Sequence, residues 1–373
     1  MKRLIIVGNP FQLMLALFFY YKVFSADDDI DVLIFKSVIG HETFANKLME
    51  LSLFRRVILL EEASPRGNWL GKTIEVIHVA VGNAEKISYI TDSCLANSDY
   101  DEVWYYNWCR WYYGIYDVIL KHEGKCTNYI AYMESVFTYT LLRQNEIQPI
   151  FSQRDKVIRF GRKCLNKWIF DPYMGDVFIQ YPGMADEIDG RYLHQLPVLS
   201  EADIDYLRTV QEVFSTPKFS KLPKYIFMAS SLEFDGFGTG ETDLIIRIAE
   251  IVGKENLIVK LHPRDNRGVI EKAGIRVMES SNVCWEAIQL TNDFSENVFL
   301  TVASASIVNA ILFSEQEVKA YYLFPLIKKM SRGFMQYCMD SVNKTIQTAH
   351  DNGIAKDIAV LDSFEALNKV LVQ

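Results

Sequence analysis

The residues with the clearest chemical potential lie where an apolar segment ends, in the stretch "IVKLHPRD" (258–265). β-Forming residues lead into His262, and Pro263 restricts the backbone before it to extended geometry. We therefore expect the His262 imidazole on stiff backbone at a strand tip, beside Lys260 and Arg264. A histidine in this position can donate a proton or a hydrogen bond to a phosphate oxygen, and it can equally cap the strand locally.

Two serines follow another apolar run, in "FLTVASASIVNAI" (299–311). Ser304 and Ser306 are predicted to be the N-cap and first-turn hydroxyls of a helix. Their hydroxyls, the free N–H groups and the helix dipole would then face an anion. Serines in this position are often only caps, but together with His262 they favour a phosphate site. The chain contains no GxxxxGK[ST] motif, and no GxGxxG follows the first strand, which disfavours ATP, GTP and dinucleotide sites.

Two carboxylates also follow predicted strands. Glu134 comes after "CTNYIAYM", and Asp235 lies in the glycine-rich "SSLEFDGFGTG". Either can act as a general base towards a reacting hydroxyl. Equally, Glu134 can be a first-turn helix residue and Asp235 part of a simple turn. The acidic runs at 27–31 and 203–205 contain DxD spacing but are interpreted as solvated charge, so no metal site is predicted.

Predicted strands alternate with predicted helices along the chain. Strands are expected at 3–8, 31–35, 56–60, 101–107, 126–133, 224–230, 256–262, 297–303 and 319–324. Helices are expected at 11–24, 41–52, 71–96, 111–122, 242–253, 285–290 and 304–313. This alternation is typical of α/β domains whose parallel sheets are covered on both faces. In such sheets ligands collect at the carboxyl ends of the strands, where Asn9, Gln12 and Ser230 also lie.

The periodicity weakens between 146 and 197, so we predict two doubly wound, Rossmann-like domains, at 1–170 and 171–373. In this division the last helix is free to pack back on the N-terminal domain. The net charge of −8 argues against a nucleic-acid partner. The cysteines form no CxxC pair, and no apolar run reaches the length of a membrane span, so a cytoplasmic protein is expected. The basic run at 154–168 is interpreted either as a solvated helix or as a surface for anionic lipid or an acidic glycan.

Several of these motifs resemble those of one group of enzymes. The opening "IIVGNPFQLMLAL" is similar to the start of bacterial family 52 glycosyltransferases, whose first strand precedes a threonine-proline-phenylalanine-glutamine turn; here Asn9 stands in place of the threonine. "KLHPRD" resembles the His-Pro motif of bacterial sialyltransferases and polysialyltransferases, and "ASAS" resembles their serine motif. One motif departs: in place of an acidic, acidic, glycine triplet the chain has Met133, Glu134 and Ser135.

The resemblance implies a GT-B fold, in which two Rossmann-like domains face across a cleft, the first binding the acceptor and the second the nucleotide sugar. It implies an inverting, metal-independent transfer of sialic acid from CMP-sialic acid to a hydroxyl of a cell-surface glycan of the lipooligosaccharide or capsule type, with no cofactor. His262 would protonate the leaving phosphate, and Glu134 or Asp235 would accept the proton of the acceptor hydroxyl. The donor-binding residues implied are Asn9, Gln12, Ser230, Pro263, Arg264, Ser304 and Ser306.

Two alternatives stay open from the sequence. One is a glycosyltransferase with another donor, CMP-Kdo or a UDP-sugar, because phosphate-binding motifs do not specify the sugar. The other is a catalytically weak CMP-binding homologue, because the acidic triplet is incomplete. The sequence also leaves room for a peripheral contact with the inner face of the cell membrane and for a homodimer.

Overall fold

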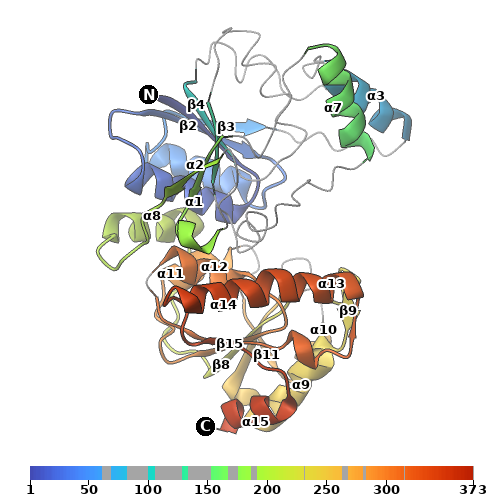
Figure 1. Cartoon of the computed structure of the whole chain (residues 1–373). Helices are drawn as coiled ribbons and strands as arrows, with labels where there is room; N and C mark the ends of the chain where they lie inside the picture. Colours follow the sequence, from blue (N-terminus) through green and yellow to red (C-terminus); the bar gives the residue numbers. More distant parts are fainter. Residues whose placement is uncertain are drawn as a thin grey trace. The chain divides into compact units, whose positions relative to one another are not determined.

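The computed structural model describes residues 1–60, 69–81, 100–105, 128–132, 153–166, 175–185, 191–230, 232–262, 268–279, 283–314 and 316–372. They fall into two compact units (Figure 1). The N-terminal unit holds the described residues up to Leu196, except 183–185, which belong with Pro197 and the rest of the chain to the C-terminal unit. Each unit contains one large parallel sheet with helices, which is the predicted α/β architecture.

The sheet of the N-terminal unit has the strand order β3-β2-β1-β4-β5-β6-β7, and every neighbouring pair is parallel. Its strands are β1 (Lys2–Val7), β2 (Asp29–Phe35), β3 (Arg56–Leu60), β4 (Glu102–Tyr105), β5 (Asn128–Tyr132), β6 (Gly175–Ile179) and β7 (Arg191–Gln195). The predicted division after residue 170 assigned β6 and β7 to the second domain. They instead continue this sheet next to β5, with Val177 and Ile179 buried in its core.

Four helices of the N-terminal unit are described: α1 (Pro10–Lys22), α2 (His41–Glu50), α3 (Trp69–Ala80) and α7 (Gln153–Cys164). Proline at the first position of α1 suits a helix start, because its missing N–H is not needed there. Every residue of α1 from Phe11 to Phe19 is buried. An apolar run of this kind is a core helix, which explains why α1 shows little one-sided patterning.

The sheet of the C-terminal unit has the order β11-β10-β8-β12-β13-β15, again all parallel. Its strands are β8 (Tyr225–Met228), β10 (Leu257–Lys260), β11 (Arg276–Val277), β12 (Val298–Thr301), β13 (Lys319–Tyr322) and β15 (Ile358–Val360). All residues of β8, β10 and β12 are buried, as expected for central strands covered on both faces. A short antiparallel ribbon joins β9 (Gly238–Thr239) to β14 (Lys329–Met330).

The helices of the C-terminal unit are α8 (Ile204–Phe214), α9 (Glu241–Val252), α10 (Gly268–Lys272), α11 (Trp285–Leu290), α12 (Ser306–Phe313), α13 (Arg332–Tyr337), α14 (Lys344–Asp351) and α15 (Phe364–Val372). The last helix packs within its own unit. The Arg247 guanidinium of α9 lies 3.8 Å from the centre of the Phe364 ring, and the Tyr225 hydroxyl donates to the Leu371 carbonyl at 2.8 Å. These contacts anchor α15 to α9 and β8. The last helix, which was expected to be free to pack back on the N-terminal domain, therefore packs on the C-terminal unit.

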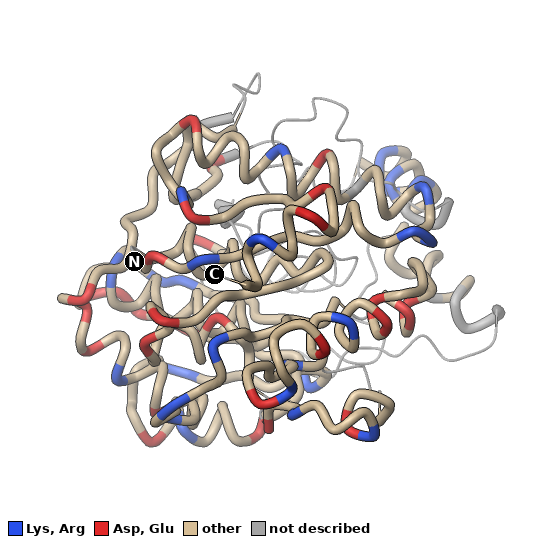
Figure 2. Tube along the Cα trace, turned by 90° about the horizontal axis from the view of Figure 1, so that it is seen from below, with Lys and Arg blue, Asp and Glu red and all other residues tan. Residues whose placement is uncertain are grey.

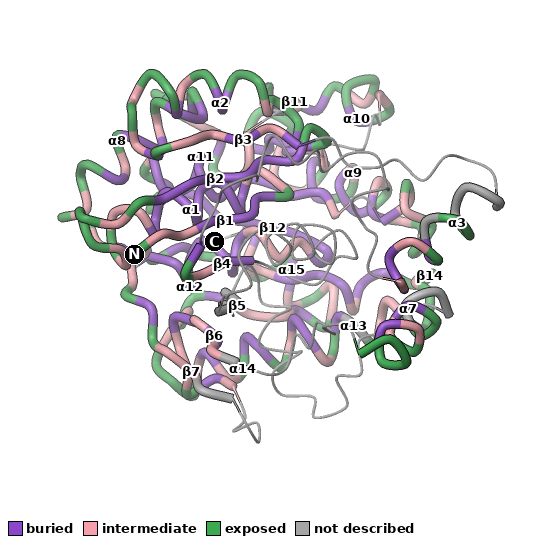
Figure 3. Tube along the Cα trace, turned by 90° about the horizontal axis from the view of Figure 1, so that it is seen from above, coloured by how far each residue is buried: buried purple, intermediate pink, exposed green. Residues whose placement is uncertain are grey.

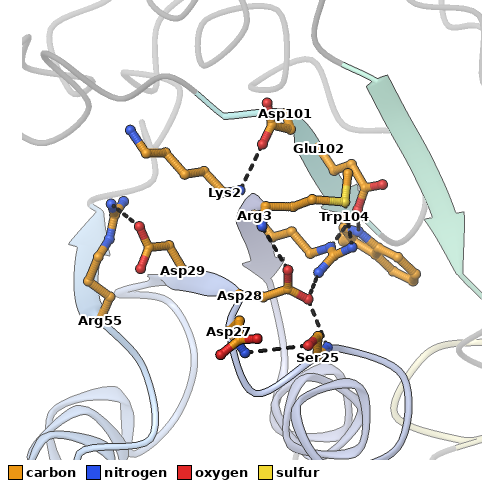
Figure 4. A network of polar contacts seen from close by, with 11 residues as sticks. Lys2, Arg3, Ser25, Asp27, Asp28, Asp29, Arg55, Asp101, Glu102 and Trp104 are labelled. Atoms are coloured by element: carbon orange, nitrogen blue, oxygen red, sulfur yellow. Dashed lines mark hydrogen bonds and ion pairs between the residues drawn. The ribbon is translucent and has the colours of Figure 1, made fainter.

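A polar network joins the beginnings of strands in the N-terminal unit (Figure 4). Arg3 bridges two acids: it forms an ion pair with Asp28, and its Nε donates to Glu102 at 2.6 Å. Glu102 also accepts from Trp104 Nε1 at 3.0 Å. Because Arg3 and Glu102 lie on paired strands and Asp28 immediately precedes β2, the network ties three segments together.

Asp31 is the most buried acid of this region, with no exposed surface, although the sequence interpreted its acidic run as solvated. Arg55, Arg56 and Tyr100 all donate to its carboxylate, at distances of 2.6 to 2.9 Å. Burial by itself would raise the pKa of Asp31, but these hydrogen bonds outweigh it and hold the pKa below its usual value. The Asp31 carboxylate therefore stabilises the edge of the sheet formed by β2 and β3.

We expect Asp31→Asn to lower the free energy of unfolding by about 3 kcal/mol, the low end for breaking a buried ion pair, because Arg55 and Arg56 can still reach water. Urea denaturation followed by circular dichroism measures this. Asp27→Asn, in the same acidic run but exposed, is the matched control and should change the value by less than about 0.5 kcal/mol. Equal effects of the two substitutions would contradict the role given to Asp31.

The lowered pKa of Asp31 also predicts a pH dependence. Its stabilising contribution is fully present above the unfolded-state pKa of about 3.9 and is lost as the pH falls through the lower folded-state pKa. Urea denaturation between pH 7 and pH 3 should therefore show a steeper loss of stability at acidic pH for the wild type than for Asp31→Asn. Parallel curves for the two proteins would refute this assignment.

Candidate functional site

The candidate site lies at the carboxyl edge of the second sheet, where three central strands end level with one another. In the sheet register, Lys260 at the end of β10 and Thr301 at the end of β12 both pair with Met228 at the end of β8. The chain segments that leave these strands carry Ser230, His262 and Ser304 to the same edge. The structure thus brings together residues that the sequence could only place at separate strand ends.

Ser230 is used to hold these segments together. Its hydroxyl accepts from the Ala303 backbone N–H at 2.9 Å and lies 3.3 Å from Thr301 Oγ1. Thr301 Oγ1 donates its only proton to the Met228 carbonyl at 2.8 Å, so Ser230 must be the donor between the two hydroxyls. The Ser230 proton is therefore already in use, and the residue positions the loop after β12 rather than offering a donor to a ligand.

The helix that follows β12 begins without a side-chain cap. Its first residue is Ser306, and its N-cap position is occupied by Ala305 with no side-chain hydrogen bond. Ser304, predicted as the cap, instead donates its N–H to Thr301 Oγ1 at 2.9 Å and accepts from the Tyr322 hydroxyl at 2.7 Å through its carbonyl. The first-turn N–H groups of α12 are therefore not covered by a side-chain cap, as in helix termini that bind anions.

Ser306 contributes to a buried polar cluster beneath this helix start. Its side chain hydrogen-bonds to Glu286 of α11, and Asn309 Nδ2 donates to Glu286 Oε1 at 3.3 Å. Burial raises the pKa of Glu286, while these hydrogen bonds and the charge of Lys260 oppose the rise. The cluster therefore fixes the first turn of α12 against α11 through a carboxylate that is only 5% exposed.

Lys260 lies beside this cluster at the tip of β10, and only 6% of it is exposed. Burial lowers the pKa of its ammonium group, and the nearby Glu286 and Cys284 oppose this. Within the described part of the chain, no hydrogen bond from the Lys260 ammonium is formed. The Lys260 side chain is thus largely withdrawn from water, and a phosphate oxygen is the kind of group that would pair with its ammonium.

His262 lies two residues beyond Lys260 and is half-buried. Residues two apart in extended backbone point to the same side of a sheet, which predicts that the imidazole lies on the side of Lys260 and Glu286. Lys260 was given no role from the sequence. Its spacing of two residues from His262 is the signal that could have placed it in the site. Pro263 and Arg264 lie outside the described residues.

The loop after β8 carries the candidate base Asp235. Glu233 in this loop accepts from the Gly240 and Thr242 N–H groups at 3.0 and 3.3 Å and from the Thr242 hydroxyl at 2.7 Å. Glu233 thereby caps the start of α9. Asp235 is partly exposed and precedes Gly236, whose φ of 71° marks a tight turn. The structure thus places Asp235 in a turn at the edge that also holds Ser230, and Glu134 lies outside the described residues.

Asn9 and Gln12 belong to the N-terminal unit, where both serve the start of α1. Asn9 Oδ1 accepts from the Gln12 N–H at 2.8 Å as the N-cap, and Gln12 Oε1 accepts from the Gly8 N–H. The Gln12 side chain is 7% exposed. These contacts give both residues a structural role in shaping the turn after β1. Among the described residues, no group of three or more His, Cys, Asp or Glu side chains is placed to hold a metal ion.

No protein-family model and no curated protein matches the sequence. Among solved structures, the glycotransferase of kitacinnamycin is similar over 99% of this chain and 89% of its own, with 11% sequence identity and a TM-score of 0.51. At this identity the likeness shows the fold alone. Together with the two parallel sheets, it confirms the predicted GT-B-like fold of two Rossmann-like domains.

Two further solved structures match with lower scores. The glycosyltransferase VinC in complex with DTDP has 10% identity and a TM-score of 0.49, covering 100% of this chain and 92% of its own. The UDP-GlcNAc 2-epimerase from Methanocaldococcus jannaschii has 12% identity and a TM-score of 0.44, covering 100% of this chain and 99% of its own. Both TM-scores are below 0.5, so neither structure adds support for the fold.

If the carboxyl edge of the second sheet is an anion site, Lys260→Met should weaken the binding of CMP by about tenfold or more, because a charge-assisted hydrogen bond contributes about 1.5–3 kcal/mol. Isothermal titration calorimetry measures the dissociation constant. Lys224→Met is the matched control, since this exposed lysine lies at the opposite end of the sheet, just before β8. Unchanged CMP affinity in folded Lys260→Met would remove Lys260 from the site.

Proposed function

We propose that the protein is a glycosyltransferase that moves sialic acid from CMP-sialic acid to a hydroxyl of a cell-surface glycan. The observation that carries this proposal is the meeting of the uncapped start of α12, the buried Lys260 ammonium and His262 at one sheet edge. These are donors for a phosphate. The resemblance of "KLHPRD" and "ASAS" to sialyltransferase motifs supports CMP-sialic acid as the donor, and the GT-B-like fold supports nucleotide-sugar transfer in general.

The chemistry expected at this edge is mainly the handling of negative charge. The bond between the sugar anomeric carbon and the phosphate oxygen of CMP breaks, and a bond from that carbon to the acceptor oxygen forms. His262 donates a proton or a strong hydrogen bond to the departing phosphate, while Lys260 and the first turn of α12 stabilise its charge. The proton of the acceptor hydroxyl passes to a carboxylate, for which Glu134 and Asp235 are the candidates.

The Lys260–Glu286 cluster has a positioning role in this proposal. Glu286 does not reach the ligand in our assignment: its oxygens are engaged by Ser306 and Asn309, which fix the first turn of α12. Its nearby charge also opposes the lowering of the Lys260 pKa that burial causes. A protonated Lys260 is needed because only the ammonium form neutralises a phosphate.

The decisive experiment is CMP release from CMP-sialic acid in the presence of EDTA, with and without a lactose-type acceptor. We expect acceptor-stimulated release from the wild type and a loss of about 10²- to 10⁴-fold for His262→Ala, the usual contribution of a general acid. His350→Ala is the matched control, because the His350 Nε2 in the same unit donates to the Ala355 carbonyl at 3.0 Å. Release that requires a divalent metal, or that survives in His262→Ala, would contradict the mechanism.

The same assay separates the alternatives. Release with CMP-Kdo or a UDP-sugar in place of CMP-sialic acid would change the donor but keep the fold and the phosphate site. CMP binding without release from any donor would identify a catalytically weak binding protein. For the base, we expect one of Glu134→Gln and Asp235→Asn to abolish transfer while leaving the affinity for CMP unchanged.

A further inference from the structure

Helices α3 and α7 form a pair in the N-terminal unit, seen side by side in Figures 1 and 3. Arg162 of α7 is fully buried and donates from Nη1 to the Val79 carbonyl of α3 at 2.8 Å. Gly161 allows close approach, because a Cβ added there would lie only 2.9 Å from Ala80 Cβ. The inner faces of α3 and α7 thus pack against each other.

The outer faces of the pair carry a concentration of exposed apolar side chains. Fourteen large hydrophobic residues are exposed in the described part of the chain, and five of them lie on this pair or directly after it. They are Ile74, Ile77, Val157, Phe160 and Leu165, with Phe160 the most exposed at 70%. Scattered exposed apolar residues are normal in proteins, but a concentration of them on two neighbouring helices is typical of an interaction surface.

Basic residues border the apolar stripe on α7. Val157 and Phe160 are three residues apart and share one face of the helix. Lys156, Arg159 and Lys163 form the adjacent stripe, which lies between this apolar face and the buried Ile158 and Arg162. Around the axis of α7 the order is therefore buried face, basic face, apolar exposed face. Figure 2 shows Lys and Arg in blue and Asp and Glu in red along the Cα trace of the chain.

We propose that this surface, formed by the five apolar residues and by Lys156, Arg159 and Lys163, docks the protein on an anionic membrane. Asp155 is the only acid within α7, whereas the whole chain carries a net charge of −8. This local positive charge is complementary to anionic headgroups, and the apolar stripe can enter the boundary with the acyl chains. No helix within the described ranges is long and apolar enough to cross a membrane, so the inferred contact is peripheral.

Charge favours a membrane over a second copy of the chain as the occupant. A two-fold symmetric dimer would place this surface against itself, and the basic stripe of one copy would then face the basic stripe of the other. Docking at a membrane also goes beyond the proposed sugar transfer. It would raise the local concentration of any acceptor anchored in the same membrane.

Vesicle cosedimentation of the full-length protein tests the proposal. We expect binding to vesicles of phosphatidylcholine with 30% phosphatidylglycerol, weaker binding to pure phosphatidylcholine, and release at about 0.5 M salt. Two variants should each lower anionic-vesicle binding by at least about tenfold: Phe160→Asp, and the triple Lys156→Gln/Arg159→Gln/Lys163→Gln. Each basic charge near the membrane contributes roughly fivefold to the affinity.

Matched controls lie on other exposed parts of the chain. Ile204→Asp removes an apolar side chain that is 59% exposed at the start of α8, and Lys221→Gln/Lys272→Gln/Lys319→Gln removes three exposed lysines of the C-terminal unit.

Retained binding in both controls supports the proposal. Absence of wild-type binding, or equal loss in test and control variants, overturns it. A wild-type dimer that Phe160→Asp converts to a monomer, without vesicle binding by either, overturns it in favour of self-association. CMP release in solution is read separately, so failure of this proposal leaves the proposed transfer intact.

Discussion

The site in the C-terminal unit depends on one electrostatic constraint, a lysine buried at the tip of a central strand. Removing the Lys260 ammonium from water is unfavourable unless negative charge lies nearby, and the Glu286 carboxyl group is close enough to oppose this cost. Glu286 is itself buried and is held by Ser306 and Asn309. The position of α12 is therefore coupled to the charge at the end of β10. A ligand phosphate would add a second negative charge next to this largely buried ammonium.

The backbone around this charge is fixed by a second set of contacts. Thr301 joins the end of β8 to the loop after β12, because its hydroxyl donates to the Met228 carbonyl and accepts from the Ser304 N–H. Ser230 adds a further link to Ala303. The groups that would meet an anion are therefore held by hydrogen bonds before a ligand arrives. Such preorganisation matters because fixed dipoles stabilise developing charge without having to reorient.

The sequence predicted the strands and helices well where their burial is simple. Fully buried strands such as β8 and β12 appear as short apolar runs, and Ser306 was correctly expected in the first turn of a helix. β6 and β7 were not predicted, because "GDVFI" and "RYLHQ" mix polar and apolar residues and follow a region of weak periodicity. Local patterns also could not show that Glu286 meets Ser306, or that Lys260 is buried. The contact of Glu286 with Ser306 depends on the packing of α11 against α12. The burial of Lys260 depends on strands that lie far apart in the sequence.

The two cationic features of this acidic chain, the basic residues of α7 and Lys260, differ in their burial. The lysines of α7 are exposed, so the proposed attraction to anionic lipid would act through water and be screened over about 10 Å at 0.1 M salt. Lys260 is shielded from solvent, so its attraction to a bound phosphate is screened much less. The same charge thus has different physical behaviour at the two places. In the proposed docking, moderate salt should therefore release the protein from a membrane while the proposed phosphate site stays occupied.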